Sequence, residues 1–539
     1  MFNNSKSRQS RFSSFFQFFK ERPWSILAIL VLVGGVAAGL IPRVLHPFRC
    51  DRSAEAQTAH FLAAGEAANR QIIVTGVEAD VTAAVPDNLT LIEDCDLSYL
   101  NYRSNSNTEL TAEQRKTLVL RLYQADSGTT PEELQTIVSG LNNANGEVVA
   151  DRNHNISISD SPDTCYLPNA GGSGGGGTPY GGPGGLDPYD VSVANNAFND
   201  QWAFKSNGIN VPVAATSGYT NTGRGVHVVV FDTAPYRITV PSLIIRRNKV
   251  ALPSPMWFTT WDNPGSTMTS SHGLFVVGLI HKMAPASNIR LVRVLNDDGC
   301  GEMWLLEKSI HDYTSRMSFW TGKLNKTVFN LSLAVDPDPL TTAVFTLETT
   351  INKAVGLGAV VIAAAGNDSS NSPNPEPMRY PAAYANVIGV AASTQTGDRS
   401  CYSNTGDVAA PGGNGGQDPD NPTDPTKKCI PRADTWTRNP GKCTDIANCE
   451  FGVVSLVETR YGSRYALWSG TSFAAPYVSG LAALAYEKWD QTAVGCLIRE
   501  GTRPLPASWR PGAVSLPEGI VDVGNTLSTA TLSACGVTP

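Results

Sequence analysis

The feature that most constrains the fold is an alternation of short apolar runs and helical patterns that begins near residue 225. The first run, residues 225–231, is rich in valine, as is typical of a strand buried on both faces of a sheet. Further strands are predicted over residues 289–294, 328–333, 359–365 and 387–391, and helices over residues 272–282, 302–316 and 339–357. This alternation predicts right-handed crossovers and an α/β fold, with a mostly parallel central sheet flanked by helices.

Polar residues follow two of the predicted strands. Asp232 comes directly after the first strand, and Asn367 comes just after the strand predicted over residues 359–365. In an open parallel sheet, ligands bind beyond the carboxyl ends of the strands. The sequence therefore predicts a functional site at this edge of the sheet.

A serine lies at the start of a long apolar stretch, residues 470–484, which reads as a buried helix. The first turn of such a helix directs backbone N–H groups and the positive end of the helix dipole toward Ser472. That environment suits a nucleophile, because backbone donors there can bind a developing oxyanion. The other interpretation is a packed helix of small residues with an incidental serine, with Pro476 near its first positions.

Ser472 needs a base, and the chain has seven histidines. Six of them lie near the apolar N-terminal segment, ahead of the glycine-rich segment, within a strand or inside helical stretches: His46, His60, His154, His227, His281 and His311. The seventh, His272, follows two serines and precedes a glycine where a helix is predicted to begin. His272 is therefore the candidate base.

Four motifs carry a resemblance to a known family. They are Asp232-Thr233, His272-Gly273, the Ala-Ala-Ala-Gly-Asn segment at 363–367 and the Gly-Thr-Ser-Phe-Ala-Ala-Pro segment at 470–476. In this order they resemble the subtilisin-like serine proteases, the subtilase superfamily, in which the acid, the base and the nucleophile occur in the same order along the chain. The resemblance covers about residues 197–485, a little over half of the chain.

The resemblance implies a serine endopeptidase that works through an acyl-enzyme and needs no cofactor for catalysis. Ser472 would attack the peptide carbonyl, His272 would move the proton, and Asp232 would orient His272. The oxyanion would be bound by the side-chain amide of Asn367 and the backbone N–H of Ser472. The peptide or protein substrate would lie along two segments, Ser332, Leu333, Ala334 and Ala364, Ala365, Gly366.

Three positions depart from the family pattern. Ala234 replaces a common glycine after the acid, Leu274-Phe275 replace a common Thr-His pair, and Ala334 replaces a glycine of the substrate strand. The changes at Ala234 and Phe275 leave open a second interpretation, a catalytically silent, surface-displayed binding protein of the same fold. A non-peptidase hydrolase is disfavoured, because the Gly-x-Ser-x-Gly pattern at residues 171–175 has no strand before it and no helix after it.

The N-terminal part predicts export. Residues 24–41 are apolar and uncharged, at the lower length limit for a membrane span. Residues 1–23 are basic, so they are predicted to stay in the cytoplasm, with residues 24–41 as a transmembrane signal anchor and the rest outside. The small residues Val36-Ala37-Ala38 leave cleavage and secretion as the alternative.

The remaining chain divides by composition. Residues 50–165 are predicted to form a small α+β region, with helices after two capping boxes at 111–114 and 130–133. Residues 166–190 form a glycine-rich linker, and residues 191–539 the catalytic domain. The resemblance implies that the region before the linker is an inhibitory propeptide. Cleavage is predicted in or near residues 171–186, where an exposed segment suits a protease.

Cysteines and charge complete the predictions. Outside the cytoplasm thiols tend to pair. Three of the ten cysteines precede the linker and seven follow it, so either one bridge crosses the linker or one thiol is free, with Cys50 the first candidate. A net charge of −7 without a basic stripe argues against nucleic-acid binding, and the absence of paired C-x-x-C spacing argues against a zinc module.

Acidic residues raise two further expectations. An insertion over residues 412–451 contains Asp418, Asp420 and Asp424, whose hard oxygens suit calcium. A solvated acidic loop is the other interpretation, so the structural calcium that the resemblance implies has no assigned ligand. Asp336-Pro337-Asp338, close to the predicted substrate strand, favours basic substrates.

Overall fold

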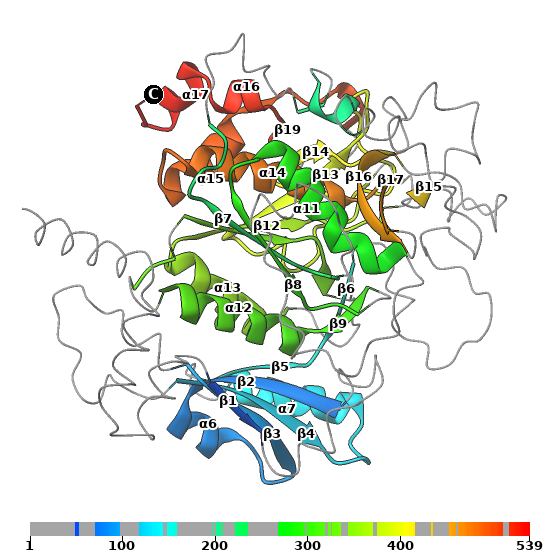
Figure 1. Ribbon diagram of the computed structural model, residues 1–539. Coiled ribbons are helices and arrows are strands. Elements are labelled where there is room, and N and C mark those ends of the chain that lie inside the picture. The colour runs from blue at the N-terminus through cyan, green and yellow to red at the C-terminus, as the bar shows by residue number, and fades with distance from the viewer. Residues whose placement is uncertain are drawn as a thin grey trace, which may run out of the picture. The chain divides into compact units, whose positions relative to one another are not determined.

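The chain divides into two units, Met1–Pro47 and Phe48–Pro539, and a computed structural model describes parts of the second (Figure 1). The described residues are 49–52, 70–97, 118–143, 148–158, 198, 201–205, 208–209, 221–234, 268–296, 299–318, 322–324, 326–335, 343–369, 374–414, 433–434, 452–459, 462–509 and 517–538. No helix in these ranges has the length and apolar character that crossing a membrane requires. The predicted anchor at residues 24–41 lies outside them, and the predicted domain boundaries stay predictions.

An eight-stranded sheet forms the centre of the larger part of the second unit, in the order β18-β19-β14-β13-β12-β10-β7-β8. All neighbours pair in parallel except β18 and β19, which confirms the α/β class and the mostly parallel sheet. The strands are β7 (His227–Asp232), β8 (Asn288–Arg293), β10 (Thr327–Leu331), β12 (Ala359–Ala364), β13 (Val387–Ser393), β14 (Val408–Pro411), β18 (Thr502–Arg503) and β19 (Ile520–Val521).

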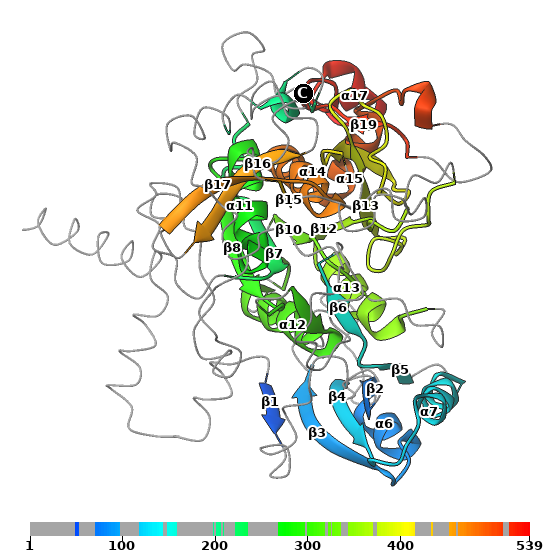
Figure 2. The ribbon, with the colours of Figure 1, turned by 90° about the vertical axis from the view of Figure 1, so that its right-hand side faces the viewer.

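Helices cover both faces of this sheet (Figure 1 and Figure 2). On β7, Val228 and Val230 belong to one apolar cluster, shared with the helices on one face, and Val229 and Phe231 belong to another. Successive side chains of a strand point to opposite faces, so the valine-rich run buries both. The helices are α11 (His272–Met283), α14 (Thr471–Tyr486) and α15 (Gln491–Glu500) on the first face, and α12 (Met303–Ser318) and α13 (Phe345–Gly356) on the second.

Helix α14 is buried along its whole length. Its alanines and its one glycine, Gly480, let neighbouring elements come close. A Cβ atom at Gly480 would lie 2.3 Å from the Cβ atom of Met283 on α11, so only glycine permits this approach of the two helices. The pair α11 and α14 therefore places its two N-terminal ends, with His272 and Ser472, in one packed layer.

A second sheet lies in the N-terminal part of this unit. Its order is β1-β3-β4-β2-β5, and every neighbouring pair is antiparallel. The elements are β1 (Arg49–Arg52), β2 (Gln71–Val77), α6 (Glu78–Ala84), β3 (Leu89–Asp96), β4 (Leu118–Ala125), α7 (Pro131–Asn143) and β5 (Val148–Arg152). One face packs against α6 and α7, and the other face joins the apolar cluster that contains α12 and α13.

The two helix predictions for this region had different outcomes. The capping box before α7 is confirmed, since the Thr130 N–H donates to the Glu133 carboxylate at 2.9 Å and the Glu133 N–H donates to the Thr130 hydroxyl at 3.2 Å. The helix expected at Leu118–Leu122 is wrong, because these residues belong to strand β4. The strand lies between β3 and β2 and buries both faces, so its apolar run lacks the polar alternation that marks a strand.

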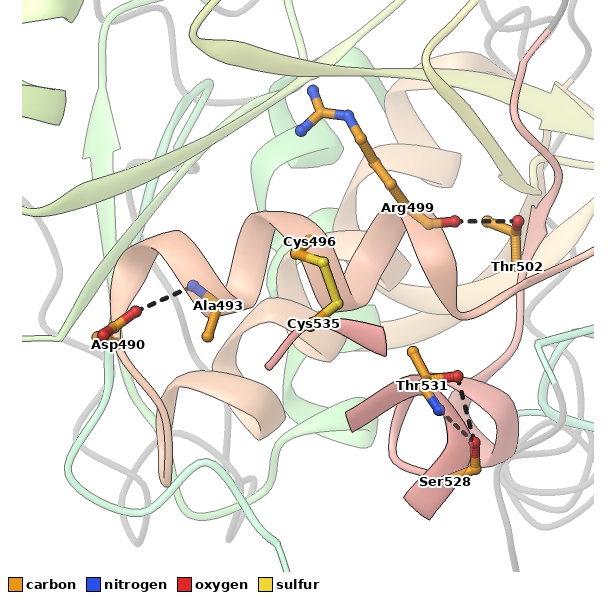
Figure 3. Close-up of a disulfide and its surroundings, with 8 residues drawn as sticks. All are labelled: Asp490, Ala493, Cys496, Arg499, Thr502, Ser528, Thr531 and Cys535. Atoms are coloured by element: carbon orange, nitrogen blue, oxygen red, sulfur yellow. Dashed lines mark hydrogen bonds between the residues drawn. A yellow bond between two sulfur atoms is a disulfide. The ribbon is translucent and has the colours of Figure 1, made fainter. Parts of the chain in front are cut away.

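Two disulfides lie within the described residues. Cys50 on β1 is bonded to Cys95, its paired residue on β3, so the suggestion that Cys50 is a free thiol is wrong. Cys496 on α15 is bonded to Cys535 at the end of α17 (Thr529–Ala534) (Figure 3). Cys300 and Cys401 are also disulfide-bonded. Described cysteines thus pair as expected outside the cytoplasm.

The remaining elements are short. A hairpin of β16 (Val453–Thr459) and β17 (Gly462–Trp468) contacts α11, where the Ser455 hydroxyl donates to the carbonyl of Phe275 at 2.7 Å. The others are β6 (Asn155–Ser157), β9 (Cys300–Glu302), β11 (Ala334–Val335), β15 (Ala433–Asp434), α16 (Val523–Thr526) and the 3₁₀ turns Trp202–Phe204, Met268–Ser271 and Ala507–Trp509.

Candidate active site

Asp232 and His272 form a buried pair. Asp232 is the last residue of β7, and its two carboxylate oxygens lie 2.8 and 3.0 Å from Nδ1 of His272, the first residue of α11. Both side chains have an exposed fraction of 0%. The two residues that the sequence placed far apart therefore meet where a parallel strand ends and a helix begins.

Thr233 and Gly273 hold this junction together. The Thr233 hydroxyl accepts the N–H of Gly273 at 3.1 Å and donates to the carbonyl of Ser270 at 3.1 Å. A Cβ atom at Gly273 would lie 2.2 Å from the carbonyl oxygen of Thr233, so any larger residue would push α11 away from Asp232. This explains why glycine follows His272.

Aromatic side chains surround the His272 ring. Its centroid lies 5.4 Å from that of Trp468 and 5.0 Å from that of Phe473. The ring centroid of Phe275 lies 4.5 Å from that of Phe473, and Phe275 is fully buried. Phe275, which departs from the family pattern, therefore packs in the core beside Asp232 and His272. Ala234, another departure, is also a core residue.

Ser472 lies in the first turn of α14. Gly470 precedes the helix with φ of 151°, a conformation that favours glycine. Pro476 is inside the helix, one turn after Ser472, and has no N–H for the Ser472 carbonyl. The Ser332 hydroxyl replaces that donor at 2.7 Å, and the Ser472 hydroxyl donates to the Ser332 carbonyl at 3.2 Å.

Asn367 is tied to the same helix start. Its side-chain oxygen accepts the N–H of Thr471 at 3.0 Å, and the N–H of Gly366 donates to the Thr471 hydroxyl at 3.2 Å. Gly366 has φ of 108°, again a glycine conformation. The residues after β12 are therefore fixed against the residue that precedes Ser472.

The predicted substrate strand is already paired. Strand β6, from the N-terminal part of the chain, lies between β11 and β9 in a three-stranded antiparallel sheet. Ser157 is opposite Ala334, Ile156 is opposite Val335, and the N–H of Ile158 donates to the carbonyl of Gly299 at 2.9 Å. This segment was not among the predicted strands, although the alternation in Ile156-Ser157-Ile158 is a short strand signal.

The segment leading to β6 also contacts two helix starts. The Asp151 carboxylate accepts the N–H groups of Phe345 and Thr346 at 2.7 and 2.5 Å, at the beginning of α13. The Asn153 side-chain oxygen accepts the N–H of Trp304 at 2.9 Å, at the beginning of α12. The first backbone N–H groups of a helix have no carbonyl partner within it, and these two side chains supply the acceptors from outside α12 and α13.

Buried carboxylates gather at this junction. Burial raises the pKa of Asp151 to about 7, against the opposing effect of the Thr346 and Phe345 donors. Burial also raises the pKa of Glu307 on α12 to about 8, although it accepts the Thr346 hydroxyl at 2.8 Å. Nearby, Glu93 on β3 is ion-paired with Lys308 on α12 and accepts the indole N–H of Trp304 at 3.1 Å.

Metal-ligating residues cluster at one place among those described, Cys50, Glu93 and Cys95. Both sulfurs are joined in a disulfide, so this group does not fit a metal ion. The aspartates that prompted the calcium and basic-substrate expectations, Asp418, Asp420 and Asp424, and Asp336 and Asp338, lie outside the described residues. Those expectations stay predictions.

Comparison with known proteins identifies the class. The fold and site define an α/β protein with a buried Asp-His pair and a serine at a helix start, and the model of the subtilase family matches residues 259–499, which include His272, Asn367 and Ser472. Subtilisin of Bacillus pumilus is 30% identical over 292 residues, 52% of this chain and 82% of that protein. The chain belongs to the subtilase family.

Other relatives are more distant or only partly covered. M-protease of Shouchella clausii (strain KSM-K16) is 28% identical over 311 residues, and the alignment spans 56% of this chain and 63% of that protein. A solved structure of a protease from Pseudoalteromonas arctica PAMC 21717 covers 62% of this chain and 98% of its own, at 24% identity and a TM-score of 0.44. Because this TM-score and identity are low, the solved structure adds no evidence to the match with the subtilase family.

Proposed function

We propose that this protein is a serine endopeptidase that uses Ser472 as nucleophile, His272 as base and Asp232 as the orienting acid. The observation that carries the proposal is the buried contact of 2.8 Å between Asp232 and Nδ1 of His272, in one layer with the helix start that bears Ser472. A carboxylate at Nδ1 holds the tautomer whose Nε2 accepts a proton, and it stabilises the imidazolium that forms.

The steps follow from this arrangement. Rotation of the Ser472 hydroxyl from the Ser332 carbonyl toward His272 lets the imidazole take its proton as the oxygen attacks the peptide carbonyl. His272 then returns the proton to the leaving amine, and water hydrolyses the acyl-enzyme by the same route. Ser472 forms the covalent bond to the substrate, His272 transfers the proton, and Asp232 acts through its hydrogen bond to His272. No cofactor is required.

Asn367 is proposed as the oxyanion donor, together with the backbone N–H of Ser472. The Thr471 N–H donates to the side-chain oxygen of Asn367, and the NH₂ group of the same amide is the donor proposed to meet a developing negative charge. The donor is held before the reaction begins, which is why such groups stabilise a transition state without reorganisation.

The N-terminal region is proposed to be an intramolecular inhibitor. Strand β6 takes the pairing positions of a substrate strand against Ala334, and Asp151 and Asn153 bind the starts of α13 and α12. Ile156 and Ile158 are buried, so the cleft is expected to accept extended peptides or protein segments with aliphatic residues at alternating positions.

The register of β6 also supports a position for self-cleavage. Ser157 is opposite Ala334, two residues after Ser332, whose carbonyl accepts the Ser472 hydroxyl. Self-cleavage is therefore proposed on the C-terminal side of β6, in or near residues 171–186. Residues 159–197, which include that segment, lie outside the described residues.

The chain is proposed to act outside the cytoplasm, anchored by residues 24–41 or secreted after their removal. The disulfides Cys50–Cys95 and Cys496–Cys535 support an oxidising compartment. The alternative of a silent binding protein rested on Ala234 and Phe275, and both are core residues that displace none of the proposed catalytic groups.

Reaction of the full chain with a serine-directed fluorophosphonate tests the proposal, alongside hydrolysis of an unfolded protein. We expect label and hydrolysis after self-processing, and neither in Ser472→Ala. A processed chain that takes no label and hydrolyses nothing would favour the binding protein instead.

A further inference from the structure

One buried asparagine holds the segment that carries Asn367. Asn404 lies between β13 and β14 and has an exposed fraction of 1%. Its side-chain nitrogen lies 3.3 Å from the carbonyl oxygen of Ala365, 3.0 Å from that of Pro377 and 2.8 Å from the Asp368 carboxylate. None of these contacts involves Asn367 itself.

The other polar atoms of Asn404 bind the same segment. Its side-chain oxygen accepts the N–H of Asp368 and the hydroxyl of Ser369, both at 2.9 Å. Its backbone N–H donates to the carbonyl of Gly366 at 3.0 Å. Residues 365 and 366 precede Asn367, and residues 368 and 369 follow it, so Asn404 fixes the backbone of Asn367 from both sides.

The packing around this contact leaves little room for adjustment. A Cβ atom at Gly366 would lie 2.5 Å from the side-chain nitrogen of Asn404. Arg379 adds a second tie, since its N–H donates to the carbonyl of Ala365 at 3.0 Å and its side chain is ion-paired with Asp368. A shift of Asn367 relative to Thr471 would break several of these bonds together.

We propose that Asn404 is a positioning residue for the oxyanion donor, a role that rests on the proposed peptidase function. It keeps residues 365–369 in the one conformation in which the Asn367 amide retains its bond to Thr471. Asparagine is required because the site needs donors and an acceptor on one short side chain. An aspartate would face two carbonyl oxygens and a carboxylate with no donor, and a serine could reach only part of the segment.

Steady-state kinetics on a peptide substrate, with Asn404→Ser measured alone and with Asn367→Ala, tests the role. We expect kcat to fall by about tenfold or more with KM nearly unchanged, because the donor acts in the transition state while the substrate strand is untouched. In the Asn367→Ala background the same substitution should change kcat by less than about twofold, since the group it positions is gone.

Two further variants separate positioning from folding. Asn221→Ala removes an equally internal asparagine, which donates to the carbonyl of Leu484 at 2.8 Å far along α14, and it should leave kcat unchanged. Ser369→Ala deletes a single hydroxyl bound to Asn404, so it should fold even if Asn404→Ser does not, with a smaller loss of kcat and the same dependence on Asn367.

The possible results differ for the two proposals. Equal losses of kcat in both backgrounds, an effect on KM alone, or no effect in an active enzyme would overturn the positioning role and leave the peptidase function intact. A processed wild-type chain without fluorophosphonate labelling or hydrolysis would overturn the peptidase function itself.

Discussion

The hydroxyl of Ser332 donates to the carbonyl oxygen of Ser472 at 2.7 Å, where a helix would normally supply an N–H from residue 476. Residue 476 is proline, so the backbone of the proposed nucleophile depends on a side chain from the loop after β10. Asn330 in turn donates to the Ser332 hydroxyl at 2.9 Å. The start of α14 is thus attached to the central sheet through Ser332.

Ser332→Ala should destabilise the protein by about 1–3 kcal/mol, because it leaves a buried carbonyl without its donor. Adding Pro476→Ala should recover much of this loss, since alanine restores an N–H four residues after Ser472. Thermal unfolding at one scan rate, in a Ser472→Ala background that prevents self-digestion, measures both effects.

Ser287→Ala is the matched control for that pair. Its hydroxyl donates to the carbonyl of Ala284 at 2.7 Å, in the turn after α11 rather than at the start of α14, so Pro476→Ala should not recover its loss. If Pro476→Ala restored the same amount of stability to both serine variants, the Ser332 hydroxyl would not be replacing the missing N–H of residue 476.

Asn367→Ala should lower kcat by about 10²–10³, the loss measured for the equivalent donor in subtilisin itself, with a smaller change in KM. The physical reason is that the donor meets charge present only in the transition state. Hydrolysis of a chromogenic peptide gives both constants. Asn386→Ala, an exposed asparagine of the same domain, should retain full activity, and a similar loss there would point to damage to the fold.

Self-processing should produce a new N-terminus in or near residues 171–186, and Ser472→Ala should keep the chain whole. N-terminal sequencing of the processed protein identifies the bond. Ile156→Asp should slow processing, because it sets a charge in a buried position of β6, while Ser139→Asp on exposed α7 should not. A new N-terminus ahead of β6 would contradict the proposed site of self-cleavage.

Docking of the cleaved N-terminal region should weaken as the pH rises. Burial raises the pKa of Asp151 to about 7 in the docked state, whereas the released region has the ordinary value near 3.8. The docked state therefore binds the proton more tightly, so this contribution is full below about pH 4 and is lost as the pH rises through 7. Burial, and to a smaller extent the charge of Asp151, raises the pKa of Glu307 to about 8, so loss of the Asp151 charge on release acts in the same direction.

Titration of the cleaved region against the catalytic domain at several pH values checks this prediction. The affinity should fall by up to about tenfold per pH unit for one such group, and Asp151→Asn should flatten the dependence. Glu132→Gln, on the exposed first turn of α7, should leave it unchanged. Binding that strengthens between pH 4 and 7 would contradict the assigned sign.

The class of the fold and the residues of the proposed site could be predicted from the sequence. Apolar runs such as residues 225–231 predict strands buried on both faces, and Asp232, His272, Asn367 and Ser472 stand in motifs whose local spacing identifies them. Local signals of this kind are strong because they depend on neighbours in the chain, as with the capping box of Thr130 and Glu133.

Other features depend on contacts that form only when the chain is folded. Leu118–Ala125 is a strand because β2 and β3 lie on either side of it, and Asn155–Ser157 pairs with Ala334 because the N-terminal sheet packs against α12 and α13. The roles of Asn404 and Ser332 likewise depend on partners distant in sequence. Hydrogen bonds between distant segments depend on which groups the packed core brings together. A local sequence pattern does not predict these pairs.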